Sequence, residues 1–132
     1  MIYILDTNTC IYFLNGTSAR IRDRIASRKV SELATTSITA AELYYGAYHS
    51  KEITKNLEIL QKFFANLQIL PFHRKAAQEF ARLKENLRKK GKMIGVFDLM
   101  IAAIARREDV TLVSHNTGEF SRIESLLLED WF

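Results

Sequence analysis

Short apolar runs and amphipathic stretches alternate along the chain, and they predict strands and helices in turn. The first run, Met1–Leu5, is unbroken and contains β-branched and aromatic residues, which is typical of a strand buried on both faces. Similar short runs predict further strands at residues 33–38, 68–70, 111–114 and 126–128.

Between these runs, apolar residues recur every three or four positions, which is the period of an amphipathic helix. Helices are expected over residues 7–15, 19–28, 51–66, 73–90 and 94–105, with one more that starts after Thr39 and runs through Tyr48. Gly16 and Gly91 stand where two of these helices should end. Strands that alternate with helices indicate an α/β domain of three layers, in which helices flank a mostly parallel central sheet of four to five strands.

The composition adds few constraints. A chain of 132 residues has the size of one domain, and a content of 48% hydrophobic and 26% charged residues is that of an ordinary globular protein. The net charge of +4 permits a polyanionic partner without requiring one. The single cysteine, Cys10, excludes an internal disulfide and a thiolate metal cluster, and we expect it in the core.

The same sequence gives an expectation for location. The longest apolar run is interrupted by Asp98 and is too short to cross a bilayer. The N-terminus enters a strand without the basic lead of a signal peptide. We therefore expect a cytoplasmic protein that does not enter a membrane.

Two carboxylates at predicted junctions between strands and helices have both a structural and a chemical interpretation. Asp6 follows the first strand, at the edge of a parallel sheet where ligands bind, but an Asp before a helix is also a common N-cap. Glu42 fits the last position of a capping box that begins at Thr39. The capping box places Glu42 in the first turn of a helix that follows a strand, at the same edge of the sheet as Asp6.

Asp98 is harder to explain by structure alone. The residues one helical turn away from it are apolar or small, namely Ile94, Gly95, Ile101 and Ala102. A carboxylate in that setting should be partly desolvated, which is unfavourable without a compensating charge. The helix N-terminus offers partial relief, but Arg106 and Arg107 lie at the far end of the same helix. A bound cation would balance the charge.

The segment Ser114–Phe120 follows another strand and contains Asn116 and Glu119, whose oxygens could join the same edge. An Asx turn with a solvated Glu is an alternative, since Gly118 favours a turn. Carboxylates gathered at one rim without a cation would repel one another and raise their own pKa values. Ligand sets made only of oxygen select Mg²⁺ or Mn²⁺, which serve phosphate chemistry.

Other types of catalytic site find no support in the sequence. The three histidines are scattered and form no paired metal-ligand motif. A nucleophile elbow, a P-loop and a GxGxxG fingerprint are all missing.

Together, these segments resemble the successive motifs of the PIN-domain ribonucleases, and within them the VapC toxins of bacterial toxin–antitoxin pairs. The motifs are the first strand with Asp6-Thr7-Asn8, then residues 39–43, 94–103 and 112–120. The order of the acids and the helix that carries Asp98 are the specific features. The similarity spans essentially the whole chain, so residues 1–132 are expected to form a single PIN-like nuclease domain.

The resemblance implies an endoribonuclease that depends on Mg²⁺ or Mn²⁺. By motif matching, Asp6 and Asp98 would be the main metal ligands. Glu42 would complete the site, directly or through water, and would help to orient the attacking water.

Four further site residues follow from the resemblance. Asn116 stands where many relatives carry a fourth Asp, which puts a second tightly held metal in doubt, and Glu119 is the carboxylate that would compensate. Thr7 and Asn8 match positions that support the first Asp and the metal by hydrogen bonds.

The resemblance also implies partners. A homodimer and a cognate antitoxin of the VapB type are expected, with the antitoxin tail covering the groove. RNA would be the substrate, and tRNA is the favoured class because several relatives cut it. Basic residues would then hold phosphates from the predicted helix at 19–28 and from the cluster Lys84 to Lys92, although a solvated helix face is the simpler explanation of each one.

The aromatic residues Tyr44, Tyr45 and Tyr48 are expected to pack helices or contact a partner, with stacking on bases as the alternative.

Two other functions remain open. A PIN-shaped module that binds RNA or protein without catalysis would use the acids only as helix caps, and Asn116 mildly favours it. A phosphatase or phospho-receiver domain also begins with a strand and an Asp, but Asn8 breaks a DxD pair and no Lys follows the strand at 111–114. Chelation by EDTA separates the first two hypotheses, because it should stop catalysis and leave simple binding intact.

Overall fold

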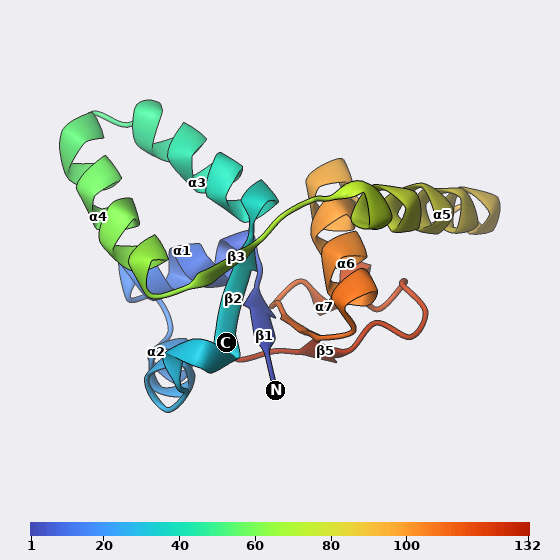
Figure 1. Ribbon diagram of the computed structural model, residues 1–132, viewed down its shortest axis with the longest axis horizontal. Coiled ribbons are helices and arrows are strands. Elements are labelled where there is room, and N and C mark those ends of the chain that lie inside the picture. The colour runs from blue at the N-terminus through green and yellow to red at the C-terminus, as the bar shows by residue number, and fades with distance from the viewer.

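Five parallel strands form the central sheet of the computed structural model, which describes residues 1–132 (Figure 1). They are β1 (Tyr3–Leu5), β2 (Leu33–Thr36), β3 (Gln68–Leu70), β4 (Thr111–Val113) and β5 (Leu128–Glu129). Their order in the sheet is β3-β2-β1-β4-β5, and every neighbouring pair is parallel. The predicted α/β fold with a sheet of four to five strands is therefore confirmed.

Seven helices cover this sheet on both sides. They are α1 (Thr7–Asn15), α2 (Ala19–Ala26), α3 (Ser37–Tyr48), α4 (Ile53–Ala65), α5 (Arg74–Lys90), α6 (Val96–Glu108) and α7 (Thr117–Phe120), with a short 3₁₀ turn, η1 (Val30–Glu32), before β2. In Figure 1, α1 to α4 gather to the left of the sheet, and α5 and α6 to its right. None of the helices combines the length and the apolar composition needed to cross a bilayer.

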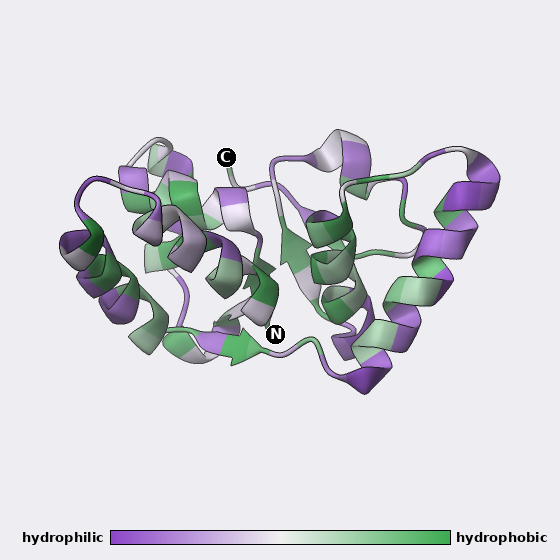
Figure 2. Ribbon diagram, turned by 90° about the horizontal axis from the view of Figure 1, so that it is seen from above, coloured by the Kyte–Doolittle hydropathy of each residue, from purple (hydrophilic) through white to green (hydrophobic).

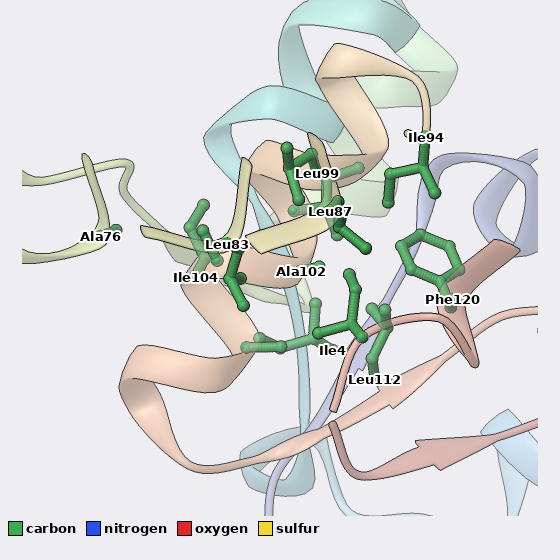
Figure 3. Close-up of a cluster of buried hydrophobic side chains, with 14 of the residues drawn as sticks. Ile4, Ala76, Leu83, Leu87, Ile94, Leu99, Ala102, Ile104, Leu112 and Phe120 are labelled. Carbon is green, nitrogen blue, oxygen red and sulfur yellow. The ribbon is translucent and has the colours of Figure 1, made fainter. Parts of the chain in front are cut away.

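The pleat of β1 divides the hydrophobic core into two parts. Ile4 points into one cluster, whereas Tyr3 and Leu5 point into the other. Figure 3 shows the first cluster, in which Ile4 and Leu112 of the sheet meet Leu99, Ala102 and Ile104 of α6 and Leu83 and Leu87 of α5. The second cluster contains buried residues of α1, α2 and α4, namely Cys10, Ile21 and Leu60, together with Trp131. Because both faces of β1 are covered, an unbroken apolar strand is required there, as predicted.

The middle of helix α6 is buried on all sides, whereas its first turn and its last residues, Arg107 and Glu108, are exposed. The stretch from Ile101 to Ala105 is fully buried between the sheet and α5, whose outer surface is hydrophilic (Figure 2). By contrast, Val96 and Phe97 are more than half exposed. The end of α6 that carries Asp98 therefore reaches the surface, while the middle of the helix lies in the core.

The start of α3 differs from the prediction. β2 ends at Thr36, and α3 begins at Ser37 instead of after Thr39. The hydroxyl of Thr36 accepts a hydrogen bond from the backbone N–H of Thr39 at 3.1 Å and so acts as the cap. The predicted capping box of Thr39 and Glu42 is wrong, and Glu42 lies in the second turn of the helix.

Smaller differences occur elsewhere. Helix α7 forms where only a turn was expected, and α6 runs from 96 to 108 instead of 94 to 105. In addition, α2 ends at residue 26 instead of 28, and β5 lies at 128–129 instead of 126–128. The expectation that the arginines of the predicted helix at 19–28 lie on a solvated face is wrong for two of them. Arg28 lies 4.6 Å from the ring centre of Tyr3, and both Arg24 and Arg28 lie within 6 Å of the ring of Trp131.

Two glycines provide a matched test of this backbone. Gly91 ends α5 with φ of +64°, which is unfavourable for any residue with a Cβ, whereas Gly46 lies inside α3 with open space around it. Gly91→Ala should therefore lower the free energy of unfolding by about 1–2 kcal/mol. Gly46→Ala should raise it by about 0.4–1 kcal/mol, because alanine restricts the unfolded chain. Urea denaturation of both variants measures these changes, and equal effects would contradict the assigned helix end.

Candidate active site

The predicted site residues lie at the end of the sheet between β1 and β4, where the chain connections run to opposite sides. From β1 the chain passes through α1 and α2 to β2 on one side, whereas β4, on the other side of β1, is reached last but one. The order of strands therefore reverses between β1 and β4, and such a point leaves a crevice at the carboxyl ends of the strands. Asp6 follows β1 there, and Ser114 to Asn116 follow β4.

Asp6 is held in place by both its backbone and its carboxylate. Its N–H donates to the carbonyl of Val113 at 3.1 Å, which continues the pairing of β1 with β4. Its Oδ1 accepts a hydrogen bond from the N–H of Thr9 at 2.9 Å, so its interpretation as the N-cap of α1 is confirmed. Asp6 is only 3% exposed. Burial raises the pKa of this carboxyl, although hydrogen bonds from Ser114 and Thr9 oppose the rise.

Glu42 reaches the same region from α3 through a threonine. The hydroxyl of Thr7 donates to Oε1 of Glu42 at 2.6 Å, and it lies 3.0 Å from the hydroxyl of Thr39. The resemblance placed Thr7 as a support for Asp6, whereas its hydrogen bonds go to Glu42 and Thr39. Thr7 is the first residue of α1 and directly follows Asp6, so its hydrogen bond holds Glu42 close to Asp6.

Asp98 meets the loop after β4. The amide nitrogen of Asn116 lies 3.5 Å from Oδ2 of Asp98 and donates to Oε2 of Glu119 at 3.2 Å. Partial burial raises the pKa of Asp98 to about 6, and repulsion by Asp6, Glu119 and Glu42 adds to the rise. The expected desolvation of Asp98 is confirmed, and the charges of the other three acids act on it.

This acidic cluster, Asp6, Glu42, Asp98 and Glu119, contains no cation of its own. The chain has 19 lysines and arginines, but none of them forms an ion pair with a member of the cluster. Arg106 of α6 pairs with Glu79 instead. Carboxylates that lie close together and partly buried without a counter-charge are unfavourable for stability. A bound divalent cation would supply the missing charge.

The donor set suits a hard cation that keeps part of its water shell. Every candidate ligand is an oxygen, which favours Mg²⁺ or Mn²⁺. No three acidic, histidine or cysteine side chains stand close enough to form a ready-made cage. Mg²⁺ in proteins is commonly held by one or two carboxylates and several waters, so two direct ligands are sufficient. Asp6 and Asp98 fit that role, and Glu42 fits contact through water.

Other candidates from the sequence lie outside this cluster. The thiol of Cys10 is fully buried, as predicted, and burial raises its pKa. Asn8 is exposed and forms no side-chain hydrogen bond to the acids. Tyr44 packs against Phe64, with ring centres 5.4 Å apart, which agrees with its predicted packing role. The link from Thr7 to Glu42 was missed, because it joins side chains 35 residues apart.

Comparisons with known proteins agree on one family. The profile of the PIN domain family matches residues 3–126. A protein of Haemophilus influenzae named Ribonuclease VapC2 is 40% identical over 129 residues, which cover 98% of this chain and 97% of the relative. A protein of Shigella flexneri named tRNA(fMet)-specific endonuclease VapC is 33% identical over the same shares of both chains.

The solved structures give the same result. The crystal structure of VapBC2 from Rickettsia felis, bound to a DNA fragment from its promoter, contains a chain that is 37% identical to this one. The two superpose with a TM-score of 0.90 over 100% of both chains. The fold inferred from the strands and helices is therefore the fold of these relatives.

The raised pKa of Asp98 predicts a pH dependence of stability. Below pH 3.8 this carboxyl is protonated in both the folded and the unfolded chain. Between 3.8 and about 6 the folded protein holds a proton that the unfolded chain has lost, so this group lowers the free energy of unfolding as the pH rises. Above that window, the ionised carboxylate is unfavourable in the fold.

Asp98→Asn should therefore raise the free energy of unfolding by about 1–2 kcal/mol at about pH 8, allowing for solvent screening, and change it little at about pH 4. Urea denaturation in the absence of divalent ions measures both values. Asp23→Asn is the matched control, because Asp23 is an exposed acid on α2. A destabilised Asp98→Asn variant at the higher pH would contradict the assigned charge repulsion.

Proposed function

The chain belongs to the PIN-domain family, among its VapC ribonucleases, and from this membership we propose that it is the toxin of a toxin–antitoxin pair that cleaves RNA phosphodiesters with Mg²⁺ or Mn²⁺. The observation that carries the metal-dependent part is the acidic cluster, whose four carboxylates lack any cationic side chain.

Asp6 and Asp98 would hold the cation, since they are the two most desolvated acids of the cluster. When bound, such an ion supplies charge to a phosphate oxygen and lowers the pKa of a water molecule. Asp6 is fixed through its backbone and its cap, and Asp98 stands in the first turn of α6, whose following residues are buried in the core. The scissile phosphate would lie between these two carboxylates.

Glu42 would orient the attacking water. Its Oε1 is occupied by the hydroxyl of Thr7, which leaves Oε2 to accept a hydrogen bond from that water. Attack on phosphorus with departure of the 3′-oxygen would leave 5′-phosphate and 3′-hydroxyl ends. Asn116 would not bind the ion strongly. Its amide nitrogen lies between the carboxylates of Asp98 and Glu119 and donates hydrogen bonds to them.

For the RNA class, we propose tRNA. The name of the Shigella flexneri relative, a tRNA(fMet)-specific endonuclease, supports this choice. The basic residues of α5 add a sequence-independent attraction for phosphates. Lys89, Lys90 and Lys92 near its end are exposed and form no ion pairs, whereas Arg88 is paired with Glu85.

We also propose a VapB-type antitoxin and a homodimer. Structures of related toxins with their antitoxins, such as VapBC2 of Rickettsia felis, support the first. For the second, apolar and aromatic side chains remain exposed on α3 and on the first turn of α6, including Tyr45, Tyr48 and Phe97 at 69%, 63% and 53%. Exposed apolar groups that lie together are typical of contact surfaces.

One observation favours a non-catalytic RNA- or protein-binding module. Asn116 partly satisfies Asp98 and Glu119 without any cation, as a purely structural cluster would require. Loss of metal distinguishes the two functions, because binding by a module would persist in EDTA and cleavage would stop.

Asp6→Asn and Asp98→Asn should each reduce RNA cleavage in Mg²⁺ by about a hundredfold or more, because each removes a charge that would hold the cation. Cleavage is measured by mapping the ends of labelled RNA. Asp23→Asn should cut at the parent rate, and EDTA should abolish cleavage by the parent. A folded Asp98→Asn variant that cut RNA as fast as the parent would refute the mechanism.

Asn116→Asp tests the proposed metal ligands by adding a carboxylate instead of removing one. A further carboxylate should tighten Mg²⁺ binding about tenfold, since affinity for hard cations rises with ligand charge. It should also destabilise the metal-free protein, because it replaces a donor to Asp98 with a like charge. Calorimetric titration with Mg²⁺ measures the affinity, and weaker binding than that of the parent would place the ion away from Asn116.

A further inference from the structure

A small hollow lies directly beside the acidic cluster. It has a volume of about 230 Å³ and is lined by Asn8, Tyr12, His115 and Asn116. Asn116 belongs to both sites, because its amide nitrogen also faces Asp98 and Glu119. A group bound in the hollow would therefore lie next to the proposed position of the scissile phosphate.

Two aromatic rings, those of Tyr12 and His115, line this hollow, and Phe132 packs against both of them. The ring of His115 stacks on Phe132, with centres 4.2 Å apart and an angle of 16° between the planes. Tyr12 meets both rings edge-on, at 6.3 Å from His115 and 5.0 Å from Phe132. The three rings support one another, which fixes the orientation of His115.

Asp130 contacts both His115 and Phe132. Its Oδ2 lies 2.9 Å from Nδ1 of His115, and its Oδ1 accepts a hydrogen bond from the N–H of Phe132 at 3.0 Å. The side chain of His115 nevertheless remains 46% exposed. One face of the imidazole is covered by Phe132, so the remaining surface is free to stack against a flat ligand.

The polar groups of the hollow suit a nucleobase. The side-chain amide of Asn8 forms no hydrogen bond within the chain, and Asn116 uses only its nitrogen, which leaves its oxygen as an acceptor. Aromatic surfaces combined with amide groups are the usual means by which proteins bind unstacked bases of single-stranded RNA.

We propose that this hollow, which we call the base subsite, stacks the base of a nucleotide next to the scissile phosphate on His115, with the amides of Asn8 and Asn116 facing the base edge. The choice of RNA as the ligand rests on the proposed function. The base subsite would require an unpaired nucleotide at the cleavage point and so restrict cutting to loops and single strands.

The test uses short fluorescent oligoadenylate and its counterpart without bases, both in EDTA so that no cleavage occurs. His115→Ala should weaken binding of oligoadenylate by about fivefold to a hundredfold, the range for one base stacked on an aromatic side chain. His115→Phe should retain most of the affinity, because it keeps a flat ring. His49→Ala is the control and should bind like the parent, since His49 is an exposed histidine after α3 that does not line the hollow.

The oligomer without bases gives the decisive comparison. His115→Ala should leave its affinity unchanged, because no base is present to stack. An equal loss for both oligomers, or no loss for oligoadenylate, would overturn the base subsite. Cleavage of RNA in Mg²⁺ is scored separately. A protein that binds bases through His115 but cuts no RNA would refute the proposed function and leave the base subsite intact.

Discussion

The pairing of β1 with β4 is the constraint on which the site depends. It aligns Leu5 with Val113, so that the residues that follow each strand, Asp6 and Ser114, emerge side by side. The backbone hydrogen bond from Asp6 to Val113 continues this pairing into the site itself. Asp6 therefore cannot withdraw from the other acids without breaking the centre of the sheet. The charge repulsion on Asp98 is therefore imposed by a strand that is paired on both sides.

The core supplies the stability that this repulsion removes. Two clusters of buried apolar side chains cover both faces of β1, and α6 is buried along most of its length. The first turn of α6 leaves the core, and that turn carries Asp98. The arrangement separates the two tasks along one helix, with packing over most of its length and chemistry at its N-terminal end.

Much of the fold and of the acidic cluster could be predicted from the sequence, because the patterns that indicate them lie within short segments of the chain. The apolar run before Asp6 and the apolar neighbours of Asp98 identified a buried strand and a desolvated carboxylate. The choice between Thr36 and Thr39 as the cap of α3 could not be made locally, since both are threonines that precede helical sequence. The pairing of β2 with β3 continues to Thr36, and the helix begins directly after that residue. The contacts of Thr7 with Glu42 and of Arg28 with Trp131 join distant parts of the chain and leave no periodic pattern.

The order of the strands also has a consequence during synthesis. β1 is made first, yet one of its two neighbours, β4, is made more than a hundred residues later. Until the ribosome has released that last quarter of the polypeptide, the first strand has an open edge and its carboxylate has no companions from α6 or the following loop. A nascent chain therefore cannot assemble the acidic cluster, which is complete only when almost the whole protein has been made.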